Sequence, residues 1–228
     1  MNSNISIKRD AIIIEPRDTH KASVIWLHGL GADGHDFEPI VPELGLADAL
    51  GVRFIFPNAP MRPVTINDGM SMRAWYDVKS HDLRDQEDTK SIIESSNMIN
   101  DYINVEIEAG LEPNKIILAG FSQGGAIALH AGLRYSSPLA GLLALSTYLP
   151  MPDQLENEAS QNKDLPIMMA HGVSDPVIPV DQGRSSCHTL KDHGYTVDWN
   201  EYMMQHAVCL EEINAISAWI KNILSQDL

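Results

Sequence analysis

The stretch Lys115-Ile116-Ile117-Leu118-Ala119-Gly120-Phe121-Ser122-Gln123-Gly124-Gly125-Ala126-Ile127-Ala128-Leu129 decides the fold. It reads as a buried strand, then Gly-x-Ser-x-Gly, then a helix. Such a tight turn strains the serine backbone, and side chains two residues away would collide, so the pattern needs Gly120 and Gly124. We predict that the turn lifts Ser122 Oγ above a sheet as a nucleophile. The alternative, a glycine-rich turn with an incidental serine, is disfavoured by the flanking strand and helix.

Short apolar runs alternate with helical patterns along the rest of the chain. The runs span residues 12–14, 24–27, 52–56, 115–119, 141–145, 167–170 and 197–202. Several are apolar throughout, which is typical of parallel strands buried on both faces. Apolar stripes over residues 92–107 and 210–224 predict helices that face the core, and Gly110 is expected to stop the first. We therefore predict an α/β fold with a mainly parallel sheet flanked by helices, with residues 1–228 as one domain.

Two connecting segments are predicted to be loops. Residues 80–90 are polar and are expected to form a surface loop. Pro57, Pro60 and Pro63 follow a predicted strand and are expected to mark a long loop, a place where binding residues often lie.

Composition narrows the class of protein. Acidic residues outnumber basic ones by 31 to 16, and the formal charge of −15 disfavours binding to nucleic acid or anionic lipid. The first ten residues show no secretory signal, and no apolar run reaches the roughly 18 residues of a membrane helix. The two cysteines, Cys187 and Cys209, predict reduced thiols in a cytoplasmic protein. We expect both to be buried packing residues rather than nucleophiles.

A second glycine-rich loop follows an earlier predicted strand. The segment His28-Gly29-Leu30-Gly31 comes directly after the apolar run 24–27. A Gly-x-Ser-x-Gly turn between a strand and a helix is typical of the α/β-hydrolase fold, in which such a loop supplies one backbone N–H to the oxyanion that forms when serine attacks an ester, and the residue after the nucleophile supplies the other. We assign these donors to Leu30 and Gln123. His28 precedes the nucleophile at a strand end, and we interpret it as structural.

Chain order selects the base and the acid, because in this fold serine is followed by the acid and then by histidine. The histidines beyond the nucleophile are His130, His171, His188, His193 and His206. His206 alone follows the last predicted strand, so we predict it as the general base. Asp175 lies in the loop after the preceding strand and would orient and stabilise that imidazole. Asp181 is the alternative acid, although its position better suits a helix cap.

With these motifs quoted, the chain resembles the acyl-protein thioesterase and small bacterial carboxylesterase family. The resemblance runs through residues 28–34, 56–60, 72–77, 120–125, 171–175 and 206–209. It implies a minimal α/β-hydrolase fold without a large cap domain, hydrolysis of carboxylic esters or thioesters, and neither metal nor cofactor. By position it supports Ser122, Asp175 and His206 as a catalytic triad. It also makes a homodimer plausible.

The resemblance further implies an apolar acyl groove near Leu30, Ile66, Met70, Trp75 and Val177. Trp75 could equally be a core aromatic. Short- to medium-chain esters are the expected substrates, and the alternatives are lysophospholipids, acylated proteins or peptides on the same site, or a non-catalytic binding protein.

Two positions depart from the family pattern. Thr147 stands where relatives usually carry glycine, and Ala207 stands where they often carry a small polar residue. Both departures bear on substrate preference, and neither removes a member of the triad.

Overall fold

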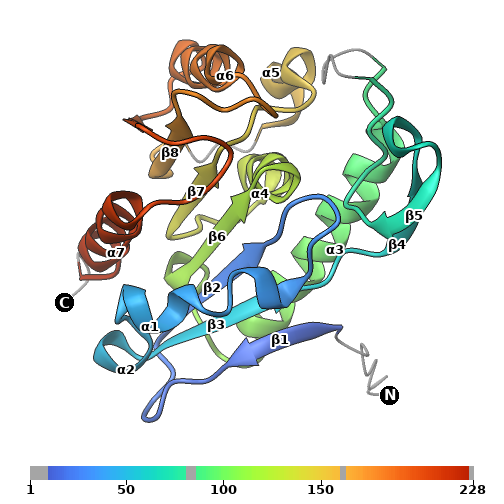
Figure 1. Cartoon of the computed structure of the whole chain (residues 1–228). Coiled ribbons are helices and arrows are strands. Elements are labelled where there is room, and N and C mark those ends of the chain that lie inside the picture. Colours follow the sequence, from blue (N-terminus) through green and yellow to red (C-terminus); the bar gives the residue numbers. More distant parts are fainter. Residues whose placement is uncertain (1–9, 81–85, 160–162, 226–228) are drawn as a thin grey trace.

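A seven-stranded sheet runs through the centre of the molecule, with helices on both faces (Figure 1). This computed structural model describes residues 10–80, 86–159 and 163–225. The strand order is β1-β3-β2-β6-β7-β8-β9; β1 pairs antiparallel with β3, and the other pairings in this sheet are parallel. The strands are β1 (Ala11–Ile14), β2 (Ala22–Leu27), β3 (Val52–Pro57), β6 (Ile116–Phe121), β7 (Gly141–Leu145), β8 (Ile167–Gly172) and β9 (Val197–Tyr202). All seven correspond to predicted apolar runs, so the mainly parallel sheet is confirmed.

The inner strands are apolar throughout because both of their faces are buried. In β8, Ile167 and Met169 belong to one hydrophobic core, whereas Met168 and Ala170 belong to the core on the opposite face. Successive side chains of a strand point to opposite faces, so a strand covered on both sides needs an unbroken apolar run.

Helices divide between the two faces of the sheet. One core contains side chains from α3 (Thr89–Glu108), α4 (Gln123–Arg134), α5 (Leu155–Glu158) and α6 (Val180–Asp192). The other contains side chains from α1 (Ile40–Leu44) and α7 (Leu210–Ser225), and α2 (Ala47–Leu50) packs partly buried side chains against it. Single 3-10 turns occupy Gly34–Asp36, Thr65–Asn67, Pro113–Lys115 and Pro152–Gln154. The two predicted amphipathic helices are thus confirmed as α3 and α7, and no large cap domain is present in the described ranges.

The prediction of a long loop marked by Pro57, Pro60 and Pro63 was only partly correct. The chain from Met61 to Arg73 forms a two-stranded antiparallel ribbon of β4 (Met61–Val64) and β5 (Met70–Arg73). Pro63 lies within β4, opposite Ser71. A proline is tolerated there because each strand of a two-stranded ribbon has one unpaired edge, where no N–H is required.

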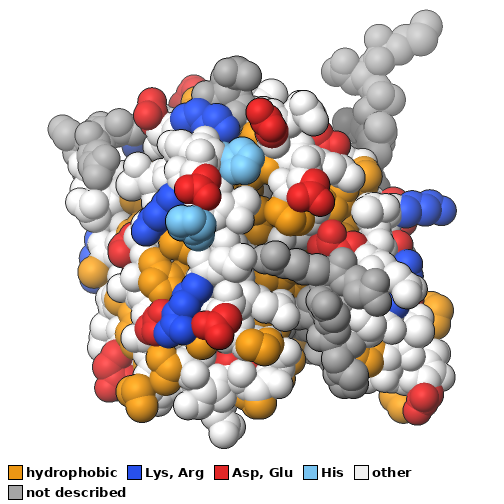
Figure 2. All heavy atoms as spheres, turned by 90° about the horizontal axis from the view of Figure 1, so that it is seen from above, with side chains coloured by type: hydrophobic (Ala, Val, Ile, Leu, Met, Phe, Trp, Pro, Cys, Tyr) orange, Lys and Arg blue, Asp and Glu red, His pale blue; other side chains and the backbone are white. Residues whose placement is uncertain are grey.

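The polar segment 80–90 ends earlier than predicted. Asp88 accepts a hydrogen bond from the N–H of Ser91 and caps α3, which begins at Thr89. Residues 81–85 of this predicted loop, like residues 1–9 of the N-terminal segment, lie outside the described residues. The described helices include none with the length and apolar character needed to cross a bilayer. On the face shown in Figure 2, basic side chains lie among acidic ones, with hydrophobic side chains between them.

The parallel strands determine where functional groups can gather. Because β2, β6, β8 and β9 run in the same direction, their carboxyl ends meet at one edge of the sheet. Ligand sites in α/β proteins form at this edge. The segments that follow these ends contain the loop at His28, then Ser122, Asp175 and His206.

Candidate active site

Ser122 occupies the sharp turn between β6 and α4. Its backbone has φ 55° and ψ −123°, a conformation that L-residues rarely adopt. A side chain at Gly120 would overlap the backbone of Gly124, and a side chain at Gly124 would overlap the carbonyl of Leu27. The collision expected from the sequence motif is therefore present, and the two glycines allow the turn to form.

Hydrogen bonds link the three predicted triad residues in a chain. Ser122 Oγ lies 2.9 Å from His206 Nε2, and His206 Nδ1 lies 2.7 Å from Asp175 Oδ2. With the imidazole neutral, Nδ1–H donates to the carboxylate and Nε2 accepts from the serine hydroxyl. The Phe121 ring packs against the imidazole with 4.7 Å between ring centroids, which restricts its rotation.

Asp175 is held as a carboxylate. Burial alone would raise its pKa, but the close approach of His171 and the hydrogen bonds from His206 and from the N–H groups of Val177 and Ile178 outweigh burial and lower the pKa well below its usual range. Its Oδ1 accepts from these two N–H groups at 2.8 and 2.9 Å. The side chain has no solvent exposure. A buried, fully bonded anion in this position can stabilise positive charge on His206.

The alternative acid lies elsewhere. Asp181 is exposed in the first turn of α6, where it pairs with Arg184 at 2.8 Å. The cap position of that helix is Pro179, so Asp181 is not the cap that the sequence suggested. The turn from Pro179 places the carboxylate on the outer face of the helix, within reach of a residue one turn later.

His28 is buried and bonded at both ring nitrogens. Its Nδ1–H donates to the Gly29 carbonyl at 2.7 Å, and its Nε2 accepts from the N–H of Ala59 at 3.0 Å. Burial lowers the pKa of this imidazole and favours its neutral form. These contacts join the loop after β2 to the loop after β3, which agrees with the structural interpretation.

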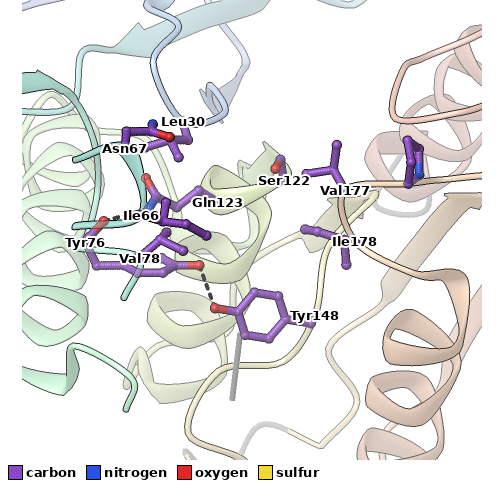
Figure 3. Close-up of a pocket in the computed structure, with 11 residues that line it drawn as sticks. Leu30, Ile66, Asn67, Tyr76, Val78, Ser122, Gln123, Tyr148, Val177 and Ile178 are labelled. Carbon is purple, nitrogen blue, oxygen red and sulfur yellow. Dashed lines mark hydrogen bonds between the residues drawn. The ribbon is translucent and has the colours of Figure 1, made fainter. Parts of the chain in front are cut away.

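Leu30 and Gln123 both line a cavity beside Ser122 (Figure 3). A side chain at Gly29 would stand 3.5 Å from Ser122 Cβ, so the loop after β2 lies directly against the serine. The N–H of Gly31 donates to the Arg73 carbonyl at 2.8 Å and anchors the loop. Gln123 is the first residue of α4, where backbone N–H groups have no intrahelical acceptor.

The Gln123 side chain has a separate role that the sequence did not indicate. It is buried, its Oε1 accepts from the N–H of Trp75 at 2.7 Å, and its Nε2 donates to the Tyr76 carbonyl at 2.7 Å. One amide therefore bonds a backbone N–H and a backbone carbonyl, and it fixes the segment after β5 against the start of α4.

The cavity has a volume of about 360 Å³. Its lining residues are Leu30, Ile66, Asn67, Tyr76, Val78, Ser122, Gln123, Tyr148, Pro176, Val177 and Ile178. Figure 3 shows Ser122 and Val177 on one side, with Tyr76 and Tyr148 on the other. The lining is largely apolar, which suits a hydrocarbon chain.

Two of the residues expected in the groove lie outside it. Trp75 is completely buried, and its indole N–H donates to the His28 carbonyl at 2.8 Å, so it is the core aromatic of the alternative interpretation. The Gln123 amide holds its backbone in that orientation. Met70 starts β5 and is 66% exposed. The ribbon pairs Met70 with Val64, beyond the residues that line the cavity.

A pair of tyrosines in the cavity wall was not predicted. The hydroxyls of Tyr76 and Tyr148 lie 2.9 Å apart and are hydrogen bonded. The pKa of Tyr76 is raised well above its usual value, mainly by burial and next by the neighbouring Tyr148, so this phenol stays neutral. The signal that could have found them is their position next to motif residues Trp75 and Thr147.

The cysteines are both free thiols. Cys187 is buried as predicted, but Cys209 is only partly buried, because it lies in the surface segment just before α7. Burial raises the pKa of both thiols, which makes each a poor nucleophile.

Ala207, the second departure from the family pattern, is exposed directly after His206. Within the described ranges, no group of three or more His, Cys, Asp or Glu side chains could hold a metal ion.

The amino-acid sequence of this chain matches a known protein family and several of its members. Residues 8–224 match the model of the phospholipase/carboxylesterase family. The chain is 39% identical to acyl-protein thioesterase 1 of Neurospora crassa, over 93% of this chain and 91% of that protein. It is 37% identical to acyl-protein thioesterase 1 of Yarrowia lipolytica, over 95% and 98%.

Solved structures agree with this placement. Arabidopsis thaliana SOBER1 superposes with a TM-score of 0.85 and 31% identity, covering 90% of this chain and 100% of that one. Acyl-protein thioesterase 2 of Zea mays gives a TM-score of 0.81 and 28% identity, covering 94% and 99%.

Proposed function

Because this chain belongs to the phospholipase/carboxylesterase family of α/β-hydrolases, we propose that Ser122, His206 and Asp175 are the catalytic triad of its ester- and thioester-hydrolysing site. The chain is a serine hydrolase, and acyl esters or thioesters are its substrate class. The observation that carries the triad is the pair of hydrogen bonds, 2.9 and 2.7 Å, that joins the three side chains at the cavity wall.

The mechanism starts with proton transfer from the serine. His206 Nε2 takes the proton of Ser122 Oγ as that oxygen bonds to the acyl carbon. The carbonyl oxygen becomes an oxyanion, and the N–H groups of Leu30 and Gln123 are the proposed donors to it. Asp175 stabilises the imidazolium.

Three proton transfers complete the cycle. His206 first protonates the leaving alcohol or thiol, and the bond from this group to the acyl carbon breaks. A water then attacks the acyl-enzyme and gives a proton to His206; the bond from Ser122 Oγ to the acyl carbon breaks, the carboxylic acid leaves, and Ser122 Oγ takes that proton from His206.

The acyl group is proposed to occupy the cavity. Val177 and Ile178 supply apolar side chains on the side of Ser122, and Ile66 and Val78 lie across from them beside Tyr76 (Figure 3). A cavity of about 360 Å³ suits a short or medium acyl chain. The names of the relatives support a second candidate, removal of acyl groups from proteins. Lysophospholipid hydrolysis is a further candidate on the same site. A cytoplasmic location is proposed from the two free thiols.

The test compares wild type, Ser122→Ala and Ser71→Ala on p-nitrophenyl acetate, butyrate, octanoate and palmitate, an acyl thioester and a lysophospholipid. Ser71 is exposed on the ribbon outside the cavity and serves as the matched control. We expect Ser122→Ala to lose about a million-fold in kcat, whereas the control keeps wild-type rates. Wild-type activity in Ser122→Ala would refute the triad. The chain-length profile then distinguishes a short-chain esterase from a long-chain deacylase.

A further inference from the structure

A second histidine lies behind the proposed catalytic acid. His171, near the end of β8, has no solvent exposure. Its Nε2–H donates to the Ile178 carbonyl at 2.8 Å, and the same nitrogen is 3.5 Å from Asp175 Oδ2. This carboxylate oxygen is also the one that contacts His206. The two imidazoles therefore approach a single oxygen from different elements.

The turn from Asp175 to Ile178 is fixed from both sides. Inside the turn, Asp175 Oδ1 accepts from the N–H groups of Val177 and Ile178. Outside it, the Ile178 carbonyl accepts from His171. Pro176, Val177 and Ile178 line the cavity, so the turn that carries the acid is also a wall of the acyl site.

The imidazole of His171 has a close-fitting seat. A side chain at Gly183 on α6 would stand 2.5 Å from His171 Nδ1 and 2.8 Å from the Trp199 ring. The Trp199 ring on β9 is 6.1 Å from the imidazole between centroids. Because residue 183 has no side chain, there is space for the His171 imidazole. Gly183 on α6 and Trp199 on β9 then leave the imidazole little room to rotate.

We propose that His171 is a positioning residue, which holds Asp175 in line with His206 and at the same time sets the place of the cavity wall at Val177 and Ile178. It touches neither the reacting atoms nor the substrate. This inference rests on the proposed function, because it assumes that Asp175 supports the base. Gly183 has a supporting part, since it leaves room for the ring.

The kinetic test uses His171→Leu, which removes the donor, and His171→Gln, whose side-chain amide N–H restores one. The control is His130→Leu, because His130 is also buried and hydrogen bonded but lies on α4 away from the turn. We expect His171→Leu to lower kcat by about 10- to 100-fold on every ester, as misplacement of a catalytic group does. KM should rise for octanoate but stay within about threefold for acetate.

His171→Gln should recover most of kcat, and the control His130→Leu should keep the wild-type kcat. In each variant kcat is calculated per active site, and the active sites are counted by their reaction with a fluorophosphonate. A kcat within twofold of wild type in His171→Leu would overturn the proposal. An equal loss in the control, or no recovery with glutamine, would do the same.

A spectroscopic measurement gives a readout independent of turnover. The proton on His206 Nδ1, shared with Asp175, should give a downfield NMR resonance that is preserved in His171→Gln and shifted or lost in His171→Leu. If wild type shows this resonance and His171→Leu leaves it unchanged, His171 does not position the acid. If Ser122→Ala remains active, the proposed function fails, whereas the resonance still reports on His171.

A last variant covers the case in which His171→Leu does not fold. Gly183→Ala keeps the imidazole but crowds its seat, so it should lower kcat and shift the same resonance. Wild-type kcat and an unshifted resonance in Gly183→Ala would overturn the proposal.

Discussion

The hydroxyl of Thr147 donates a hydrogen bond to the carbonyl oxygen of Ser122 across 2.7 Å. Ser122 has a positive φ, and its N–H is bonded to the Leu145 carbonyl at 2.9 Å. The N–H and the C=O of the strained serine are thus both hydrogen bonded to the end of β7, the strand next to β6 in the sheet, and to the segment just after it. The family resemblance predicts a glycine at position 147, which has no hydroxyl to make this contact.

Thr147→Val tests the contribution of this bond. Valine keeps the shape of the side chain but removes one of the two donors to the Ser122 carbonyl, which keeps the N–H of Ala126 at 3.2 Å, so we expect the free energy of unfolding to fall by about 1 kcal/mol. Strain at Ser122 is then less well opposed, and kcat should fall. Urea denaturation and ester hydrolysis measure the two effects. Thr189→Val is the control, because that hydroxyl also donates to a carbonyl, in a hydrogen bond at the exposed surface of α6. Equal losses in both variants would contradict the prediction.

The tyrosine pair is expected to limit the acyl chains that bind well. Tyr76→Phe and Tyr148→Phe each remove one hydroxyl of a buried pair, and each should cost about 1–2 kcal/mol of stability. The double variant presents an apolar wall, so its kcat/KM for octanoate should rise severalfold relative to that for butyrate. A double-mutant cycle on both quantities measures the coupling. An unchanged chain-length profile in the double variant would show that the pair does not act in selectivity.

Gln123→Leu separates the two roles of this residue. The variant keeps the backbone N–H proposed for the oxyanion but leaves the Trp75 N–H and the Tyr76 carbonyl without partners. We expect a loss of about 2–4 kcal/mol in the free energy of unfolding, and a higher KM because Tyr76 lines the cavity. Thermal unfolding and steady-state kinetics provide the measurements, with exposed Gln154→Leu as the control. Wild-type stability would refute the clamp.

Glu212 should make stability depend on pH. This carboxyl in the first turn of α7 is buried, and burial raises its pKa to about 8, which the nearby N–H of Cys209 only partly opposes. The folded state therefore binds more protons than the unfolded state between the ordinary value of 4.5 and about 8. The free energy of unfolding must fall as pH rises through this window.

Glu212→Gln removes this titration. Relative to wild type, we expect it to gain stability on going from pH 5 to pH 9, on the order of 4 kcal/mol. Denaturation at pH 5, 7 and 9 checks this, and exposed Glu211→Gln should follow the wild-type curve. Parallel curves for wild type and Glu212→Gln would exclude an ionisable role for Glu212.

The sheet could be predicted because its signals are local. A strand buried on both faces must be apolar throughout, and the turn at Ser122 requires glycine at 120 and 124, so both features can be recognised within a short window. The order of serine, acid and histidine then selected Asp175 and His206. The structure brings these residues together, and their catalytic role remains the prediction that Ser122→Ala tests.

The cavity wall could not be predicted in the same way. Gln123 contacts Trp75 across 48 positions and Tyr76 across 47, and Tyr76 contacts Tyr148 across 72. Periodicity shows that a residue is buried, but it does not show whether its side chain faces a core or a cavity. The sequence therefore left two interpretations of Trp75, a residue of the acyl groove or a core aromatic, and in the structure its side chain lies in the core.

The arrangement of β6, β8 and β9 also makes enzymatic activity a report on folding. Ser122 and His206 are separated by 84 positions, and β9, which delivers His206, joins the sheet through β8. Contacts of such long range are slow to form because loop closure is costly. An intermediate that has formed the serine turn but has not docked β9 would possess a nucleophile without a base. Recovery of hydrolysis during refolding should therefore follow the docking of this edge strand rather than the formation of helices.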